Sequence, residues 1–237
     1  MNDDDIYSEP REGVDAFEFN REVVDVFEDM IGRSVPHYLD NLEELVALAA
    51  KAFQPRTRGY DLGCAKGAIA LPLALKLQAL EARLIAGDKS VDMIASLREK
   101  IGKLPIEARC QDVLDVEIEQ ASVVILNYLL QFISPGERGK VLQNIYAGLM
   151  PGGIVLISEK ITHDDPAMAR IYIDRHQAFK KANGYSLLEI SQKRQALEEV
   201  LVPESLDAHL ERLKAIGFSI VDVWDKHYNF VSLYCRK

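Results

Sequence analysis

Short apolar runs alternate along the middle of the chain with longer segments whose apolar residues recur at helical spacing. The clearest run, 122–127, is apolar within and bounded by polar residues, which is typical of a strand buried on both faces of a sheet. The pattern predicts strands at 58–62, 83–88, 106–110, 122–127 and 154–157, and helices at about 68–80, 91–101 and 135–150. We expect Pro151-Gly152-Gly153 to end the last of these helices. Strands that alternate with helices indicate an α/β protein with a doubly wound, mostly parallel sheet.

A helical layer is predicted ahead of the first strand. Apolar residues among charges in 14–27 indicate an extended segment followed by a short amphipathic helix, and 29–38 is expected to turn. Ser34 and Pro36 are start signals for a second helix. Residues 13–51 are therefore expected to form an N-terminal helical cover.

The connection after the fifth strand is too long for a simple loop. Helical spacing recurs within this connection, at 166–182 and 187–200. Two strand patterns come after it, at 218–224 and 230–234. We therefore expect a helical insertion at 162–215 and a closing antiparallel hairpin at 216–237. Together with a core at 58–161, these parts are expected to make residues 1–237 a single domain.

Composition and charge narrow the class of protein. The 237 residues are 48% hydrophobic and 27% charged, which is ordinary for a globular chain, and the net charge of −9 disfavours binding to a nucleic-acid backbone. No apolar run approaches the roughly 20 residues of a membrane span, and the acidic start is unlike a secretory signal. The three cysteines are odd in number and far apart, so we expect no disulfide framework, no metal and a cytoplasmic location.

The stretch Tyr60-Asp61-Leu62-Gly63-Cys64-Ala65-Lys66-Gly67 joins the first predicted strand to its helix. A strand, a glycine turn and a helix N-terminus can cradle a nucleoside, because glycine lets the backbone approach a ligand closely. Ala65 stands where a dinucleotide fingerprint has its second glycine, and the Gly-Lys-Ser/Thr ending of a P-loop is missing. Asp61 directly before the glycines resembles the first motif of class I S-adenosylmethionine (SAM) methyltransferases. The alternative is an ordinary turn of an α/β protein.

Polar residues also follow the next strands, at the edge where such sheets bind ligands. Asp88 lies about 20 residues past the glycines, where an acidic residue pairs with ribose hydroxyls. Asp112 is suited to accept from an adenine amino group, and Asn127 follows the fourth strand. Each residue alone could be a turn former or a helix cap. In sequence with Gly63, at matching strand ends, they predict SAM binding.

Beyond this core the chain resembles the carboxy-S-adenosyl-L-methionine synthase family. The most specific matching stretch is FKKANGYSLLEISQKR at 179–194, inside the predicted insertion. The other matching stretches are 26–38, 60–64, 126–132 and 158–160. The resemblance covers nearly the whole chain after the first dozen residues. Ala65-Lys66 and Lys89 depart from the residues expected there, beside the ligand.

The resemblance implies a class I methyltransferase-like (Rossmann-like) sheet of seven strands whose last strand is antiparallel. It implies that SAM and prephenate are substrates, that phenylpyruvate is released, and that carboxy-SAM is the product. A separate enzyme would use this product at the tRNA wobble uridine, and the family precedent suggests a homodimer. The resemblance implies Arg194 as the catalytic group. It implies these contacts to the SAM derivative: Tyr38, Gly63, Cys64, Ala65, Asp88, Lys89, Asp112, Val113, Asn127 and Arg194.

Other interpretations stay open at this point. The chain could be a SAM-dependent methyltransferase acting on a small molecule or tRNA, or a SAM-binding module without catalysis. A planar guanidinium is the natural partner for the extra carboxylate of carboxy-SAM, but Arg194 could instead be a solvated helix residue paired with Glu198. His37, His176 and His227 are expected at the surface, with no catalytic role. The proton acceptor is not identified.

Overall fold

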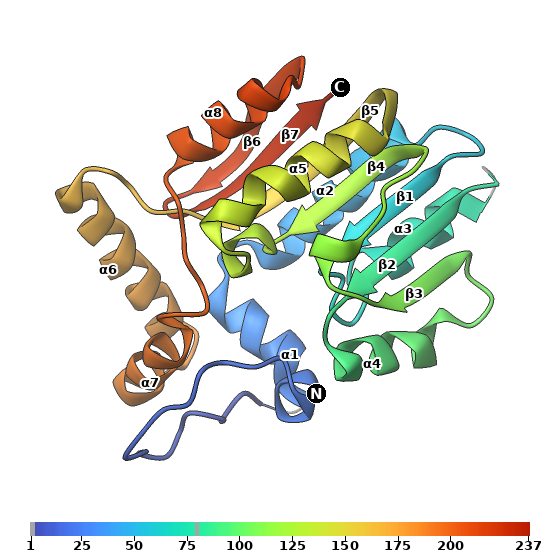
Figure 1. Cartoon of the computed structure of the whole chain (residues 1–237). Coiled ribbons are helices and arrows are strands. Elements are labelled where there is room, and N and C mark those ends of the chain that lie inside the picture. The colour runs from blue at the N-terminus through green and yellow to red at the C-terminus, as the bar shows by residue number, and fades with distance from the viewer. Residues whose placement is uncertain (1–2, 79–80) are drawn as a thin grey trace.

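The computed structural model describes residues 3–78 and 81–237, and within them seven strands form one sheet covered by helices on both faces (Figure 1). The strands are β1 (Arg58–Leu62), β2 (Arg83–Asp88), β3 (Ile106–Cys110), β4 (Ala121–Asn127), β5 (Leu149–Lys160), β6 (Ile220–His227) and β7 (Phe230–Arg236). Their order is β3-β2-β1-β4-β5-β7-β6, with β1 to β5 parallel and β7 antiparallel to both neighbours. This arrangement confirms the predicted fold class.

The helices follow the predicted alternation. They are α1 (Arg21–Ser34), α2 (Tyr38–Ala52), α3 (Ala70–Leu77), α4 (Val91–Ile101), α5 (Pro135–Gly148), α6 (Pro166–Ala182), α7 (Leu187–Leu197) and α8 (Leu206–Ile216), with short 3₁₀ turns η2 (Val113–Asp115) and η3 (Leu130–Phe132). The predicted end of the helix at 68–80 lies partly outside the described residues. No helix in the described ranges is both long and apolar enough to cross a membrane.

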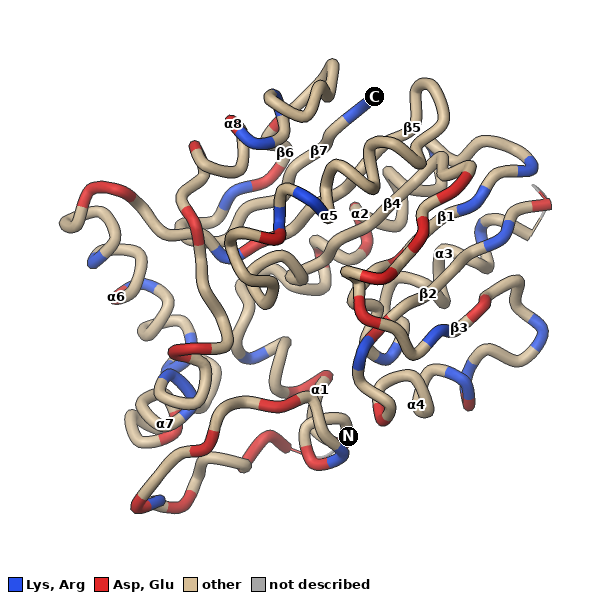
Figure 2. Tube along the Cα trace, viewed as in Figure 1, with Lys and Arg blue, Asp and Glu red and all other residues tan. Residues whose placement is uncertain are grey.

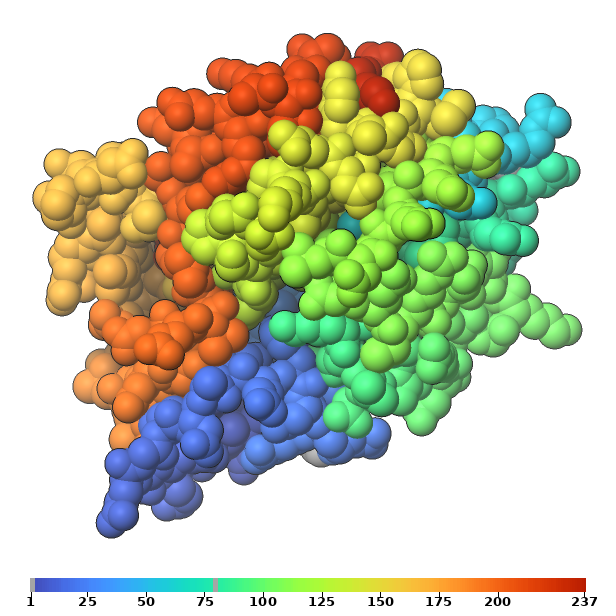
Figure 3. Space-filling view, viewed as in Figure 1, coloured from blue at the N-terminus to red at the C-terminus, as the bar shows by residue number. Residues whose placement is uncertain are grey.

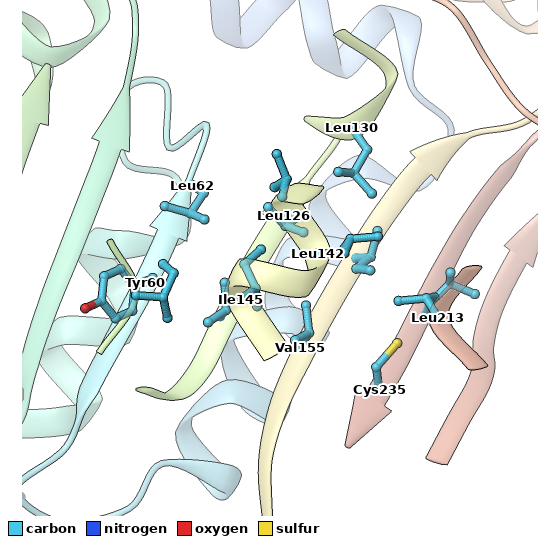
Figure 4. Packing of buried hydrophobic residues seen from close by; sticks show 14 of the residues in the cluster. Tyr60, Leu62, Leu126, Leu130, Leu142, Ile145, Val155, Leu213 and Cys235 are labelled. Carbon is cyan, nitrogen blue, oxygen red and sulfur yellow. The ribbon is translucent and has the colours of Figure 1, made fainter. Parts of the chain in front are cut away.

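Alternation along β4 builds a core on each face of the sheet. Val124 and Leu126 face the side covered by α5 and α8, whereas Val123 and Ile125 face α2, α3 and α4. Figure 4 shows Leu126 and neighbouring strand residues packed with Leu142 and Ile145 of α5 on the first side. Because both faces are covered, ligands can reach the sheet only at its ends.

The first helix is longer than predicted. α1 continues to Ser34, so residues 29–34, which were expected to form a turn, are helical. Met30 is buried in a cluster with Met93 of α4, and Asp29 forms an ion pair with Arg33 one turn later, at 3.0 Å. These contacts stabilise a last turn that the sequence pattern alone did not indicate.

The boundary between α5 and β5 also differs from the prediction. α5 ends at Gly148, and β5 begins at Leu149 and passes through the Pro151-Gly152-Gly153 stretch that was expected to end the helix. A Cβ at Gly148 would lie 2.1 Å from the carbonyl oxygen of Ile118, so a close approach of two backbones requires glycine there. Gly152 has a φ of +73° beside a register shift in the pairing with β4, so the glycines form an irregularity within the strand.

The predicted insertion separates into two parts in space. α6 and α7 lie together beside α1 and the N-terminal arm (residues 3–20), away from the sheet faces (Figure 1). α8 instead packs on the sheet, where Leu213 joins the same core cluster as α5. The arm, α6 and α7 therefore form a side layer at the carboxyl ends of the parallel strands.

Candidate functional site

A cavity of about 320 Å³ lies at the carboxyl ends of β1, β2 and β4. Its wall is completed by the N-terminal arm, α1, α6 and α7. Figure 3 shows the blue N-terminal segment against the orange segment of α7 on one side and the green core on the other. Segments from both ends of the sequence thus enclose one site, of the size that small-molecule ligands occupy.

The glycine turn forms the floor of this cavity. Gly63 has a φ of +72°, and a Cβ there would lie 2.9 Å from Leu129. The amides of Gly63 and Cys64 donate to the carbonyl of Gly87 at 2.8 and 3.1 Å, which ties the turn to β2. Ala65 adopts a φ of +45°, a conformation that favours glycine, at the position where the sequence lacks one. The backbone of this turn therefore borders the cavity directly.

Asp88 at the end of β2 holds the strained Ala65. Its Oδ2 accepts from the Ala65 amide at 3.0 Å, and its Oδ1 accepts from the Ser90 amide at 2.9 Å. Burial raises the pKa of Asp88, and these two amides oppose the shift. An ionised carboxylate has about four lone-pair sites, so each oxygen can still accept from a ribose hydroxyl.

Asp61, in β1, is the acidic residue that the sequence reasoning did not count among the ligands. It is only 2% exposed, it lines the cavity, and its Oδ2 has no hydrogen-bond partner among the described residues. Burial raises its pKa to about 7, and the field of Asp88 adds to the shift. A buried unpaired carboxylate oxygen fits the α-ammonium group of SAM. The signal was its position directly before the glycines.

Other strand-end residues reach the same cavity. Asp112, Val113 and Lys89 line it near β2 and β3, and Asp112 Oδ1 accepts from the Leu114 amide at 3.0 Å. Asn127, after β4, lines it as well, and its Oδ1 accepts from Asn41. The candidate residues that share this one cavity are Tyr38, Gly63, Cys64, Ala65, Asp88, Lys89, Asp112, Val113 and Asn127.

Aromatic rings form the cover over the strand ends. Tyr38 at the start of α2 is 9% exposed, and its ring centroid lies 6.3 Å from that of Tyr128. Phe19 of the arm packs edge-on against Phe132, with centroids 5.3 Å apart. Burial raises the pKa of Tyr38, so its hydroxyl stays protonated. An apolar cover of this kind excludes water and offers ring faces to a cation.

Arg194 is the candidate that the structure does not bring into the cavity. Its side chain is exposed on α7, and no carboxylate of the described residues, including Glu198, lies within 4.0 Å of it. Burial and, after it, the charge of Arg194 lower the pKa of Lys160, a cavity residue, so Arg194 lies near this side of the cavity rim. The residue before it, Lys193, does line the cavity.

Sequence reasoning missed the basic end of the cavity. Lys160 at the end of β5, Lys180 on α6 and Lys193 on α7 all line it. His176, which was expected at the surface, lines it too, and its Nε2 lies 2.8 Å from the carbonyl oxygen of Ser34. That expectation was wrong because α6 packs back over α1. Within the described ranges, no three His, Cys, Asp or Glu side chains gather as metal ligands.

The nearby Glu159 has a structural role instead. Its two carboxylate oxygens accept from the amides of Leu130 and Gln131 at 2.7 and 2.9 Å, which fixes the turn after β4. The cavity therefore combines acids at the nucleoside end, aromatic rings in its cover and ammonium groups at the far end. This arrangement can bind a cationic nucleoside beside a small anion.

Comparison with known proteins also indicates a SAM-dependent enzyme. Residues 60–153 match a family described as a methyltransferase domain. The chain is 45% identical, over 99% of its length and 98% of the relative, to a carboxy-S-adenosyl-L-methionine synthase of Geobacter metallireducens. A protein of the same name from Actinobacillus pleuropneumoniae is 42% identical over 100% of both chains.

Solved structures share the fold at low sequence identity. Magnesium protoporphyrin IX methyltransferase of Synechocystis PCC 6803 with bound SAM is 16% identical, with a TM-score of 0.57 over 95% of this chain and 86% of that one. A DhpI-SAM-HEP complex is 20% identical, with a TM-score of 0.58 over 92% of this chain and 94% of that one. At these identities the likeness shows the fold alone.

Proposed function

The chain belongs to the carboxy-S-adenosyl-L-methionine synthase family, as its full-length relatives show, and from this premise we propose the reaction that the cavity carries out. It is an enzyme of the transferase type that makes carboxy-SAM from SAM. The observation that carries the proposal is the two-ended cavity. At one end, Asp61 Oδ2, which has no partner among the described residues, suits a cation, and at the other end three lysines suit an anion.

The protein's own residues divide the binding of SAM between them. Asp88 accepts from the ribose hydroxyls, and Asp112 accepts from the adenine amino group. Asp61 takes the α-ammonium of the methionine part, and its ionised form is stabilised by that contact. The rings of Tyr38 and Tyr128 lie over the sulfonium, where a cation is attracted to their faces.

The donor that we propose is prephenate. It loses one carboxyl group as carbon dioxide and its hydroxyl as hydroxide, which leaves phenylpyruvate. The hydroxide takes a proton from the sulfonium methyl group and becomes water, and the resulting ylide carbon bonds to the carbon dioxide. The buried aromatic cover limits access of bulk water, which would otherwise protonate the ylide and release the carbon dioxide.

Arg194 is proposed to bind the new carboxylate of carboxy-SAM through a two-bond fork. Its place at the rim, beside cavity-lining Lys193, supports this role. The Arg194 side chain is exposed on α7. The fork therefore requires either that Arg194 moves inward, or that a second copy of the chain places its own Arg194 over the site. We propose a homodimer that works in the cytoplasm and releases its product to a tRNA-modifying enzyme for the wobble uridine.

The test is to incubate purified protein with SAM and prephenate and to follow both products by mass spectrometry. Equal amounts of carboxy-SAM and phenylpyruvate are expected. Label at the ring carboxyl of prephenate, the one lost when the ring becomes aromatic, should appear in carboxy-SAM. Formation of S-adenosyl-L-homocysteine with a methylated acceptor would instead identify a methyltransferase, and absence of any conversion would favour a SAM-binding module.

A further inference from the structure

Three ammonium groups from different elements meet at one end of the cavity. Lys160 ends β5, Lys180 lies on the last turns of α6, and Lys193 lies on α7. No two of them are on the same helix or strand, so only the folded chain brings them together. Each also lines the cavity, which places positive charge against whatever enters there.

These lysines are not equally paired. Lys193 Nζ bonds to Asp4 Oδ2 at 3.0 Å and to Ser34 Oγ at 3.3 Å. Among the described residues, the ammonium groups of Lys160 and Lys180 donate no hydrogen bond within 3.5 Å and have no carboxylate within 4.0 Å. Burial lowers the pKa of both; the charge of Arg194 adds to the shift of Lys160, and the charges of Lys160 and Lys193 add to that of Lys180. Like charges left without partners in a semi-enclosed cavity are unfavourable unless a ligand pairs with them.

Bound SAM increases this imbalance, because its sulfonium adds another positive charge. The cavity has the volume of a small-molecule site, so a small anion suits these groups better than a polyanion such as nucleic acid. We infer that Lys160 and Lys180 form the subsite that binds the two carboxylates of a small dicarboxylate, the carboxyl donor of the proposed function, on which this inference rests. Lys193 is already paired with Asp4, so it does not pair directly with the donor.

The charges fit the course of the reaction. A dicarboxylate brings two negative charges to the two lysines. After transfer, one carboxylate remains on the decarboxylated donor and one has formed on the SAM methyl carbon, while the released hydroxide has become water. The number of carboxylates in the cavity is therefore unchanged: the carboxylate that stays on the donor keeps its place at the lysines, and the new one is available to the Arg194 fork.

The test uses Lys160→Met, Lys180→Met and the double variant. Lys181→Met is the matched control, because Lys181 is the exposed neighbour of Lys180 on α6. Each single variant should raise the KM for prephenate about 10-fold or more, the usual effect of losing one charge-assisted bond. The affinity for SAM alone, measured by calorimetry, should stay the same or increase, since cations near the sulfonium are removed. Lys181→Met should change neither.

A second measurement is independent of turnover. Protein saturated with S-adenosyl-L-homocysteine is titrated with prephenate, with a non-reacting dicarboxylate (succinate) and with monocarboxylate phenylpyruvate. Wild type should bind the dicarboxylates more tightly than phenylpyruvate, and the double variant should lose this preference. If wild type makes no carboxy-SAM but shows the lysine-dependent preference, the proposed reaction fails and the dicarboxylate subsite stands.

Two results would overturn the inference. An unchanged KM for prephenate in the folded double variant would show that the lysines do not bind the donor. A loss of SAM affinity as large as the loss of donor affinity would show that the carboxylate of SAM itself occupies the lysines. Thermal unfolding against Lys181→Met checks folding, and Lys160→Arg with Lys180→Arg, which keep the charge, should recover much of the donor affinity.

Discussion

At the residue scale, two buried carboxyl groups in the site differ in how their oxygens are paired. Burial raises the pKa of Glu159 to about 8 and that of Asp61 to about 7. Both oxygens of Glu159 accept from backbone amides, so its role is complete within the protein. Asp61 lines the cavity and its buried Oδ2 has no partner among the described residues, so we expect a ligand to supply that partner.

Asp61→Asn should weaken SAM binding about 10- to 150-fold, the range for losing a hydrogen bond to a charged group. In wild type the affinity for SAM should increase as the pH rises from about 5.5 to 7.5, because the free carboxyl ionises with a pKa of about 7 and only the anion attracts the ammonium group. Calorimetry across this range measures both effects. The pH dependence should flatten in Asp61→Asn but persist in Asp40→Asn, an exposed control on α2.

Lys180 should take up a proton when an anion binds. Burial, together with the charges of Lys160 on β5 and Lys193 on α7, lowers its pKa to about 7, and Asp4 in the arm opposes the shift. At pH 8 the free amine is therefore mostly neutral, and a bound carboxylate raises its pKa again. His176 on the same helix has a strongly lowered pKa and stays neutral throughout.

Calorimetry of prephenate binding to the S-adenosyl-L-homocysteine complex, in buffers of different ionisation enthalpy, measures this uptake. We expect up to about one proton at pH 8 and little at pH 6, because below its pKa the lysine is already charged. Lys180→Met should abolish the uptake. A proton uptake of the same size in that variant would show that another group titrates.

Arg194 should decide which SAM species the site prefers. Arg194→Ala should weaken carboxy-SAM binding by about 2–4 kcal/mol, or roughly 30- to 1000-fold, because one carboxylate loses its partner. The affinity for SAM should hold steady or increase, since a cation near the sulfonium is removed. The ratio of the two dissociation constants in wild type and variant is the measurement. Equal weakening of both ligands would refute the carboxylate fork, and Arg194→Lys should recover only part of the preference.

At the element scale, the N-terminal arm connects α1 to α7. The side chains of Asp4 and Lys193 are only 1% and 6% exposed, and their ion pair is 3.0 Å long. Asp4 also accepts from the Tyr185 hydroxyl, and its amide donates to Asp29 Oδ2 at 2.7 Å. A second contact between the arm and α7 is made by Gln192 of α7, whose side-chain amide donates to the Tyr7 carbonyl at 2.9 Å. Asp4 therefore joins the arm to α7 and to the loop between α6 and α7 through its carboxylate, and to α1 through its amide.

Asp4→Ala should reduce the free energy of unfolding by about 3–5 kcal/mol, the usual cost of removing one partner of a buried pair. The reason is that Lys193 is left as a buried cation close to Lys180. Chemical denaturation measures the change, with exposed Asp5→Ala as the control. Adding Lys193→Met to Asp4→Ala should recover stability. Equal stability of the Asp4 and Asp5 variants would show that the arm does not hold the side layer.

Elements with local signals were predictable from the sequence. α4 and α6 begin and end where expected, because Ser90 and Asp165 cap them and their apolar spacing is regular. The end of α1 and the start of β5 depend on distant contacts instead: Met30 meets α4, and Gly148 meets Ile118. A sequence pattern does not contain such contacts, so both boundaries were wrong.

The same distinction holds for the site. Residues at the ends of parallel strands share one edge by topology, so the sequence could place Gly63, Asp88, Asp112 and Asn127 in one cavity. The cavity position of Lys180 depends on how the side layer folds back over the sheet edge, and nothing in the spacing of α6 indicates it. Whether these residues touch SAM stays a prediction.

At the scale of the whole molecule, charge is distributed unevenly between the surface and the cavity. The chain carries a net charge of −9, and Figure 2 shows acidic segments along the N-terminal arm and on the chain leading into β4. Lys160, Lys180 and Lys193 line one end of the cavity, which has the volume of a small-molecule site and so suits a small anion. An acidic exterior around a cavity with one basic end suits a protein that selects small anions.

The protein should therefore not bind tRNA tightly, although we propose that its product serves tRNA modification. Nucleic-acid affinity depends on lysines and arginines that can displace counterions along a phosphate backbone, and the net charge of this chain opposes that contact. Fluorescence anisotropy with labelled tRNA at physiological ionic strength should show no sub-micromolar binding, with or without SAM. A tRNA enzyme with a basic surface serves as the positive control. Tight binding that weakens steeply with salt would contradict a diffusible product and favour a methyltransferase that acts on tRNA. Absence of binding, together with carboxy-SAM in solution, would mean that the two steps are linked only by a small molecule that one protein releases and another captures.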